Sequence, residues 1–229
     1  MRSVCTLHLD GHNIIGSASE TACNSSVGIR VGLPVLPMLS QVRVLGTGTI
    51  SNFFIGFRAQ NSAGSFVKFV TVTGACTNFF SFGFQILGPG GQWKLQENVV
   101  REPGLTSEGI LLQNIDDNDL VRNDVNDTIG VFASNNNTVV NNVASDNQGG
   151  IEFGFFGLPS NNNEIHANTT TNNSTGSGLA IDVGSTGNNV TGNSAFNNSP
   201  FDMQDNNPGC DNNKWQGNHF GIANQPCIQ

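Results

Sequence analysis

A four-residue pattern of apolar and variable positions recurs eight times along the chain. Each copy has a small residue, an apolar residue, a variable residue and a second apolar residue, and neighbouring copies begin 20 to 28 residues apart. The copies begin at Gly28, Gly56, Gly83, Gly109, Gly130, Gly150, Gly178 and Pro200. Successive strand side chains point to opposite faces, so each copy predicts a short strand whose second and fourth residues face inward. Self-similarity at this period is typical of solenoids, and we expect an all-β solenoid of about eight to nine coils.

Stacking these strands gives two inward columns that are apolar throughout. Each such side chain gains about 1.5 to 3 kcal/mol on full burial, which offsets much of the conformational entropy lost on folding. One expected column contains Ile29, Phe57, Phe84, Ile110, Val131, Ile151, Leu179 and Phe201. The other contains Val31, Ala59, Ile86, Leu112, Ala133, Phe153, Ile181 and Met203.

A second recurring pattern places an asparagine three residues after an apolar position. Asparagine tolerates the left-handed backbone of a tight corner, and its amide can hydrogen-bond to the equivalent amide about 4.8 Å away in the next coil. A ladder of this kind satisfies buried amides, so we expect these asparagines to be structural. The predicted ladder contains Asn98, Asn123, Asn142, Asn168, Asn193 and Asn218.

The composition of the 229 residues limits the classes of partner that we expect for this protein. The repeat runs through nearly all of the chain without a linker, so we expect a single domain over 1–229, with 205–229 as a C-terminal capping segment. Seventeen acidic residues against nine basic ones give a net charge of -8, which disfavours nucleic acid. No apolar run reaches the roughly 20 residues of a membrane helix, and no signal sequence opens the chain.

The cysteines predict an oxidising environment. Cys210 and Cys227 bracket the last segment, where a disulfide would staple a final coil that has nothing to stack on. Cys5 pairing with Cys23 across one coil is one further possibility, which would leave Cys76 as a small buried residue. Disulfides form outside the cytoplasm, so we expect a secreted, periplasmic or cell-surface protein whose leader or first coil has been removed.

These features together resemble a known family. The segment Leu9-Asp10-Gly11-His12-Asn13-Ile14, the repeated strand pattern, the asparagine ladder and the closing segment from Cys210 to Ile228 are similar to secreted bacterial right-handed parallel β-helix proteins of the pectin-lyase-like superfamily. The resemblance implies the fold but leaves the activity open. The same coil serves lyases, hydrolases, epimerases, carbohydrate-binding proteins, copper-delivery proteins and phage adhesins.

Candidate chemistry lies on the outward positions of the first strand pattern. Glu152, Asp182 and Asp202 fall on consecutive coils, so their carboxylates are expected within about 10 Å of one another, where they could act as catalysts or share a calcium ion. Lyases of this fold pair such acids with a basic residue, for which Arg58 or Arg30 is the candidate. The substrate-binding candidates on this face are Arg30, Gln60, Gln85 and Gln113.

Two other groups of residues suggest chemistry more weakly. Asp116, Asp117 and Asp119 form an acidic run that is similar to the paired acids of glycoside hydrolases, although corner turns rich in Asp and Asn also explain it. His8, Asp10 and His12 alternate along one expected strand face, as metal ligands would.

Three functions are compatible with the sequence. The first is a binder of an extended polysaccharide or cell-surface glycan along the strand face. The second is a polysaccharide lyase, glycoside hydrolase or epimerase acting on a uronate-containing polymer. The third is a structural or adhesin-type module, whose open N-terminal edge would favour end-to-end self-association.

Overall fold

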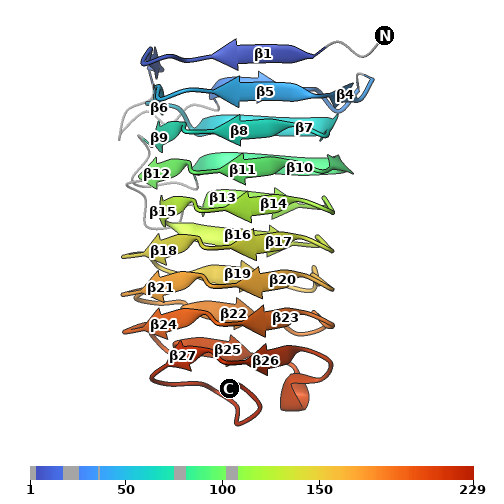
Figure 1. Ribbon diagram of the computed structural model, residues 1–229, viewed down its shortest axis with the longest axis vertical. Helices are drawn as coiled ribbons and strands as arrows, with labels where there is room; N and C mark the ends of the chain where they lie inside the picture. The colour runs from blue at the N-terminus through green and yellow to red at the C-terminus, as the bar shows by residue number, and fades with distance from the viewer. Residues whose placement is uncertain (1–3, 18–25, 36, 75–80, 102–107) are drawn as a thin grey trace.

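The chain winds into a solenoid bounded by three parallel sheets (Figure 1). This architecture comes from a computed structural model, which describes residues 4–17, 26–35, 37–74, 81–101 and 108–229. Each sheet contains nine strands, and each coil passes through sheet 2, then sheet 3, then sheet 1 before the next coil stacks on it.

Sheet 1 carries the strand pattern that begins with a small residue. Its strands are β3 (Val27–Val31), β7 (Ile55–Ala63), β10 (Phe82–Gly91), β13 (Glu108–Gln113), β16 (Thr128–Phe132), β19 (Ile151–Phe153), β22 (Leu179–Ile181) and β25 (Met203–Asp205), with β4 (Leu39–Ser40) paired to β7.

Sheet 2 precedes the asparagine corner. Its strands are β1 (Cys5–His8), β5 (Val42–Leu45), β8 (Phe66–Lys68), β11 (Lys94–Gln96), β14 (Asp119–Val121), β17 (Thr138–Val140), β20 (Glu164–His166), β23 (Asn189–Thr191) and β26 (Lys214–Gln216). Sheet 3 follows that corner. Its strands are β2 (Ile14–Ile15), β6 (Thr49–Ser51), β9 (Thr71–Thr73), β12 (Val99–Arg101), β15 (Asp124–Asn126), β18 (Val143–Ser145), β21 (Thr169–Thr171), β24 (Ser194–Phe196) and β27 (His219–Phe220).

The all-β parallel solenoid predicted from the repeats is confirmed. The first and last strands of each sheet have a neighbour on one side only, and the solenoid has about seven turns, slightly fewer than expected. Among the described residues, the only helix is the short 3₁₀ segment η1 (Pro208–Cys210). No helix in that part of the chain is long and apolar enough to cross a lipid bilayer.

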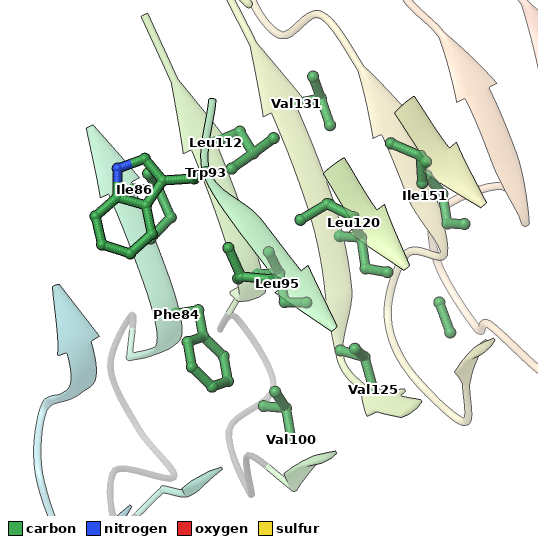
Figure 2. Packing of buried hydrophobic residues seen from close by; sticks show 14 of the residues in the cluster. Phe84, Ile86, Trp93, Leu95, Val100, Leu112, Leu120, Val125, Val131 and Ile151 are labelled. Carbon is green, nitrogen blue, oxygen red and sulfur yellow. The ribbon is translucent and has the colours of Figure 1, made fainter. Parts of the chain in front are cut away.

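The core is a file of apolar side chains between the sheets. Figure 2 shows part of it, with Leu112 from sheet 1, Leu120 from sheet 2 and Val125 from sheet 3. Each of these three side chains is fully buried. Aromatic rings fill the wider N-terminal coils, where Phe57 lies 5.8 Å from both Phe84 and Trp93 between ring centroids.

The predicted inward columns are correct for six of the eight strands and wrong by two residues in the other two. In β16, Ile129 and Val131 occupy the places expected for Val131 and Ala133. In β25, Met203 and Asp205 occupy those expected for Phe201 and Met203. A bulge before Ile110 displaces the pairing with β16. A slip of two residues keeps every side chain on its own face, so the alternation of apolar residues does not reveal it.

The predicted asparagine ladder is present at the corner between sheets 2 and 3. Its amide-to-amide hydrogen bonds measure 2.9 to 3.1 Å from Asn98 to Asn218. The left-handed residue of the corner, however, is the one before the ladder asparagine, such as Arg122 or Asn141. The ladder positions therefore use the hydrogen-bonding amide of asparagine and not its tolerance of a left-handed backbone.

Two further ladders occupy the other corners. One runs through Asn118, Asn137, Asn163, Asn188 and Asn213, and the other through Asn147, Asn173 and Asn198. Both end on a carboxylate, because Asn213 donates to Asp205 and Asn198 donates to Asp202. A carboxylate accepts hydrogen bonds without donating any, so it can complete the last rung of a ladder without leaving a donor unpaired.

The C-terminal end is closed by several contacts. The expected disulfide joins Cys210 to Cys227, and Trp215 Nε1 donates to the buried Asp205 Oδ2 at 2.8 Å. At the N-terminal end, Cys5 is an exposed free thiol, so the suggested pairing with Cys23 is not formed. Cys23 and Cys76 themselves lie outside the described residues.

Candidate functional site

The outer face of sheet 1 carries the predicted site residues. Strand pairing places the outward side chains of successive coils in one column. That column contains Arg30, Arg58, Gln85, Leu111, Gly130, Glu152, Ala180 and Gln204. Because of the two-residue slips, Gln204 takes the place expected for Asp202, and Gly130 takes the place that Phe132 would hold without a slip. The N-terminal end of the face is basic and the C-terminal end is acidic.

Arg58 and Gln85 form the basic end with Arg30. The Arg58 Nε donates to Gln85 Oε1 at 2.5 Å, and burial together with repulsion from Arg30 lowers the pKa of the Arg58 guanidinium. Gln60 and Gln113 lie half-buried on either side of Leu87, along the next outward column. The predicted substrate-binding side chains therefore share one face.

Arg58 does not reach the acids that it was expected to assist. Its strand β7 and the Glu152 strand β19 are separated by three intervening strands. Four strand spacings amount to about 19 Å, beyond the reach of a direct contact. The pairing of Arg58 with Glu152 is therefore wrong for a single catalytic centre.

Glu152 and Asp182 are brought together at the acidic end. They line a shallow hollow of about 240 Å³ together with Asn206, Phe155 and Phe156. Asn206 Nδ2 donates to Asp182 Oδ1 at 3.2 Å, which orients that carboxylate. The hollow therefore combines hydrogen-bonding groups with aromatic surface.

Phe155 and Phe156 line the aromatic side of this hollow, and Phe132 stacks on Phe155. The Phe132 ring lies over Gly130, where an added Cβ would come within 2.7 Å of it, and it stacks on Phe155 with 5.1 Å between centroids. Phe155 contacts Phe156 edge-on at 4.3 Å. Phe156 is 87% exposed and has a φ of 44°, a left-handed conformation that is rare for a bulky residue.

Glu108 is a candidate site residue that the repeated sequence patterns did not predict. It is the first residue of β13 and pairs with Thr128 of β16, and its buried Oε2 accepts no hydrogen bond from a described residue. Burial and then repulsion from Glu152 raise the Glu108 pKa to about 8. The sequence could have indicated this residue by its place directly before Gly109 of the strand pattern. Burying a charged side chain there is costly unless the charge is paired.

Glu152 lies close enough to Glu108 for their charges to interact. An added Cβ on Gly149 would lie 2.7 Å from Glu152 Oε1 and 3.2 Å from Thr128 Oγ1, so the Glu152 carboxyl leans toward the Glu108 side of the face. Burial and then repulsion from Asp182 raise the Glu152 pKa. Of the two carboxyls, Glu108, with its pKa of about 8, is the one that can donate a proton or a hydrogen bond near neutral pH, as a general acid does.

Asp202 is not part of this cluster. Its side chain is 4% exposed, its Oδ1 accepts from the Asn198 backbone N–H and amide, and its Oδ2 accepts from the backbone of Gly221 and Ile222. It ends a ladder and holds the C-terminal segment, so the expectation that it joins Glu152 and Asp182 around calcium is wrong.

The other metal and acid hypotheses find little geometric support. Among the described residues, no group of three or more His, Cys, Asp or Glu side chains is arranged to hold a metal ion. His8 Nδ1 lies 3.9 Å from Asp10 Oδ1, and both side chains are exposed. Asp116 accepts hydrogen bonds from the backbone and the amide of Asn135, as a corner residue does.

Comparison with known proteins shows likeness in fold. No protein-family model matches the sequence, and no curated protein matches it. The crystal structure of the periplasmic alginate epimerase AlgG is similar with a TM-score of 0.63 and 17% identity, over 74% of this chain and 39% of that one. A mutant of the same epimerase is similar with a TM-score of 0.65 and 15% identity, over 83% of this chain and 48% of that one.

The present chain thus spans less than half the length of these solved proteins. At such low identity the likeness concerns the fold, which agrees with the three parallel sheets and the stacked coils described above. On these grounds the chain is a right-handed parallel β-helix protein.

Proposed function

We propose that this protein binds an extended polysaccharide along the outer face of sheet 1. The observation that carries the proposal is the hollow at the acidic end, where the exposed Phe156 ring lies beside Asp182 and Asn206. Sugar rings have an apolar face and a rim of hydroxyl groups. An aromatic ring next to carboxylate and amide groups is complementary to both.

The shape of the face favours a polymer. Sheet 1 stacks eight strands without interruption, so its outer face extends for about 34 Å along the solenoid axis. Polar side chains recur along that length, from Arg58 and Gln85 to Glu152 and Asp182. A single small ligand would use only one part of such a surface.

Other observations agree with a glycan partner. The structurally similar epimerase acts on alginate, which is itself a polysaccharide, and is described as periplasmic. The Cys210–Cys227 disulfide is compatible with an oxidising compartment outside the cytoplasm, where structural polysaccharides are found.

Replacing Phe156 with alanine should weaken glycan binding roughly fivefold or more, since each ~1.4 kcal/mol of lost contact is a factor of 10 in affinity. Affinity electrophoresis against a panel of neutral and uronate-containing polysaccharides measures the change. Phe196→Ala is the matched control, because it removes an exposed ring from sheet 3. Equal binding by the wild type and Phe156→Ala on every retained polymer would contradict the proposal.

Catalysis at the same face is the second candidate, and the raised pKa values of Glu108 and Glu152 favour it. A protonated carboxyl next to an ionised one is the arrangement used for general acid and base catalysis on glycosidic bonds and on carbons next to a carboxyl group.

If the protein is an enzyme, Glu108→Gln and Glu152→Gln should each lower turnover by about 100-fold or more while leaving polysaccharide affinity within a factor of two or so. Product formation is followed by the appearance of reducing ends, of unsaturated products or of epimerised residues. Glu164→Gln, at an exposed position on sheet 2, is the control. No turnover by the wild type on any polymer that it binds would leave the binding function and reject catalysis.

A further inference from the structure

The charges of this protein are separated along the solenoid axis. Residues 1–101 contain seven Lys and Arg against three Asp and Glu, whereas residues 102–229 contain two against fourteen. The coils stack in sequence order along one axis (Figure 1). The separation of charge along the sequence therefore makes the N-terminal coils basic and the C-terminal coils acidic. An anionic ligand is therefore attracted to the N-terminal coils even though the whole chain carries a net charge of -8.

The cations of the N-terminal coils differ in whether they form an ion pair with another described residue. Lys68, Arg101 and Arg122 form ion pairs with Glu97 or Asp124. Arg43 and Lys94 form none with any residue that the structure describes. Both project from the outer face of sheet 2, which is separate from the face proposed above to bind polysaccharide.

Arg43 and Lys94 flank one aromatic ring. Arg43 of β5 pairs with Phe66 of β8, and Phe66 pairs with Lys94 of β11, so the three side chains occupy one outward column on consecutive strands. A hollow of about 450 Å³ lies there, lined by Arg43, Leu45, Gly64, Phe66, Lys94 and Gln96. Phe66 is a large apolar side chain on an outer face, and it remains partly exposed.

The spacing of the two cations indicates the kind of ligand. Two strand spacings separate their backbones by about 10 Å, and Phe66 occupies the strand between them, so the two cations are spaced along the solenoid axis. Two sugar units of an extended chain span a comparable length. The hollow therefore suits a ligand whose negative charges recur along a chain that runs parallel to the solenoid axis.

The remaining groups suit a sugar. Phe66 offers an apolar surface to the face of a pyranose ring, and the Gln96 amide donates to Glu97 at 2.8 Å, which leaves its carbonyl oxygen for a hydroxyl group. The Arg43 guanidinium can bind a carboxylate through two parallel hydrogen bonds. We infer that this hollow on sheet 2 is a second binding surface, and that its ligand is a uronate-containing, carboxylate-bearing polysaccharide.

The test compares an oligogalacturonate with the same oligosaccharide after its carboxyl groups have been reduced to alcohols. Fluorescent labelling at the reducing end and thermophoresis give the affinity of the full chain for each. Arg43→Gln and Lys94→Gln should each weaken binding of the oligogalacturonate about fivefold or more, and the reduced oligosaccharide should bind weakly to every variant. Binding of the acidic probe should also fall as salt is raised.

Lys214→Gln is the matched control, because Lys214 lies in the same register column as Arg43 and Lys94 at the opposite end of sheet 2. It removes the same charge without touching the hollow and should leave the affinity unchanged. All three positions are on an outer face, and an unchanged melting temperature confirms that the variants fold.

Three results would overturn the inference: an equal loss in Lys214→Gln, equal binding of the acidic and reduced probes, or no binding of the acidic probe by the wild type. The second surface is also separable from the first, because Arg43→Gln should weaken oligogalacturonate binding by the same factor in the wild type and in Phe156→Ala. A loss in Phe156→Ala with no loss in Arg43→Gln would assign the acidic glycan to sheet 1 instead.

Discussion

Asn142→Ala is expected to lower the free energy of unfolding by roughly 3 to 5 kcal/mol, because each buried polar group that loses its partner costs about 1 to 3 kcal/mol. The Asn142 side chain is fully buried in the middle of the ladder. Its Oδ1 accepts from the backbone N–H and the amide of Asn123, and its Nδ2 donates to Leu120 O and Asn168 Oδ1. Alanine leaves these neighbours in place without partners.

Chemical denaturation of the wild type and the variant measures this change. Asn189→Ala is the control, because Asn189 is on the outer face of sheet 2 and its amide makes a solvent-exposed contact with Glu164. Its loss should cost about 0.5 kcal/mol or less, as is usual for surface substitutions. Equal destabilisation by the two substitutions would mean that the ladder contributes no more than any surface amide.

The second large effect is expected from Glu108 and depends on pH. Its pKa is raised to about 8 in the folded protein, so the folded state holds a proton that the unfolded chain releases near pH 4.5. The stabilisation from this group is therefore complete below that pH and is lost as the pH rises through about 8. Each unit of pKa difference corresponds to about 1.4 kcal/mol, so the fall in stability should amount to a few kcal/mol.

Denaturation curves from pH 5 to pH 9 give this profile. Glu108→Gln keeps the shape of the protonated acid and removes the titration, so the variant should be more stable than the wild type at pH 9 and should lose less stability across the range. Glu164→Gln, on the exposed face of sheet 2, should keep the wild-type profile. A wild-type stability that is flat over this range would contradict the buried, unpartnered state of the Glu108 carboxyl.

The two predictions concern different properties of the same fold. The ladder at Asn142 holds the coils together at a corner, where every amide has a partner. The Glu108 carboxyl at the start of β13 has no hydrogen-bond partner for its Oε2 among the described residues, and it lowers stability at high pH. Destabilising groups of this kind cluster at functional sites, which is why Glu108 and Glu152 carry the catalytic alternative.

Local pattern was enough to predict the architecture. Alternation of apolar residues identified the strands of sheet 1, and the spacing of Asn98, Asn123 and Asn142 identified one ladder before any contact was known. These predictions depend on periodicity, which each coil repeats. A repeated unit that can bury its apolar face only against a copy of itself leaves few alternative folds.

Predictions of the site were less accurate because they needed the exact register between coils. Glu152 and Asp182 meet as expected, but Asp202 moved from the outer face to the end of a ladder when β25 paired two residues further along. Arg58 is on the predicted face but four strand spacings from Glu152. Corner lengths vary from coil to coil, and a slip of two residues leaves the apolar alternation unchanged.

The sequence by itself determined the fold class, the inward residues of six of the eight patterned strands, one complete ladder and the closing disulfide, because all of these follow from short-range periodicity and spacing. Only the tertiary structure decided which polar side chains become neighbours. It placed Glu108 near Glu152 from residues more than 40 positions apart, and it set Phe66 between Arg43 and Lys94. Those contacts depend on the number of residues in each coil, because that number decides which residues lie beside one another in neighbouring coils. No local pattern determines it.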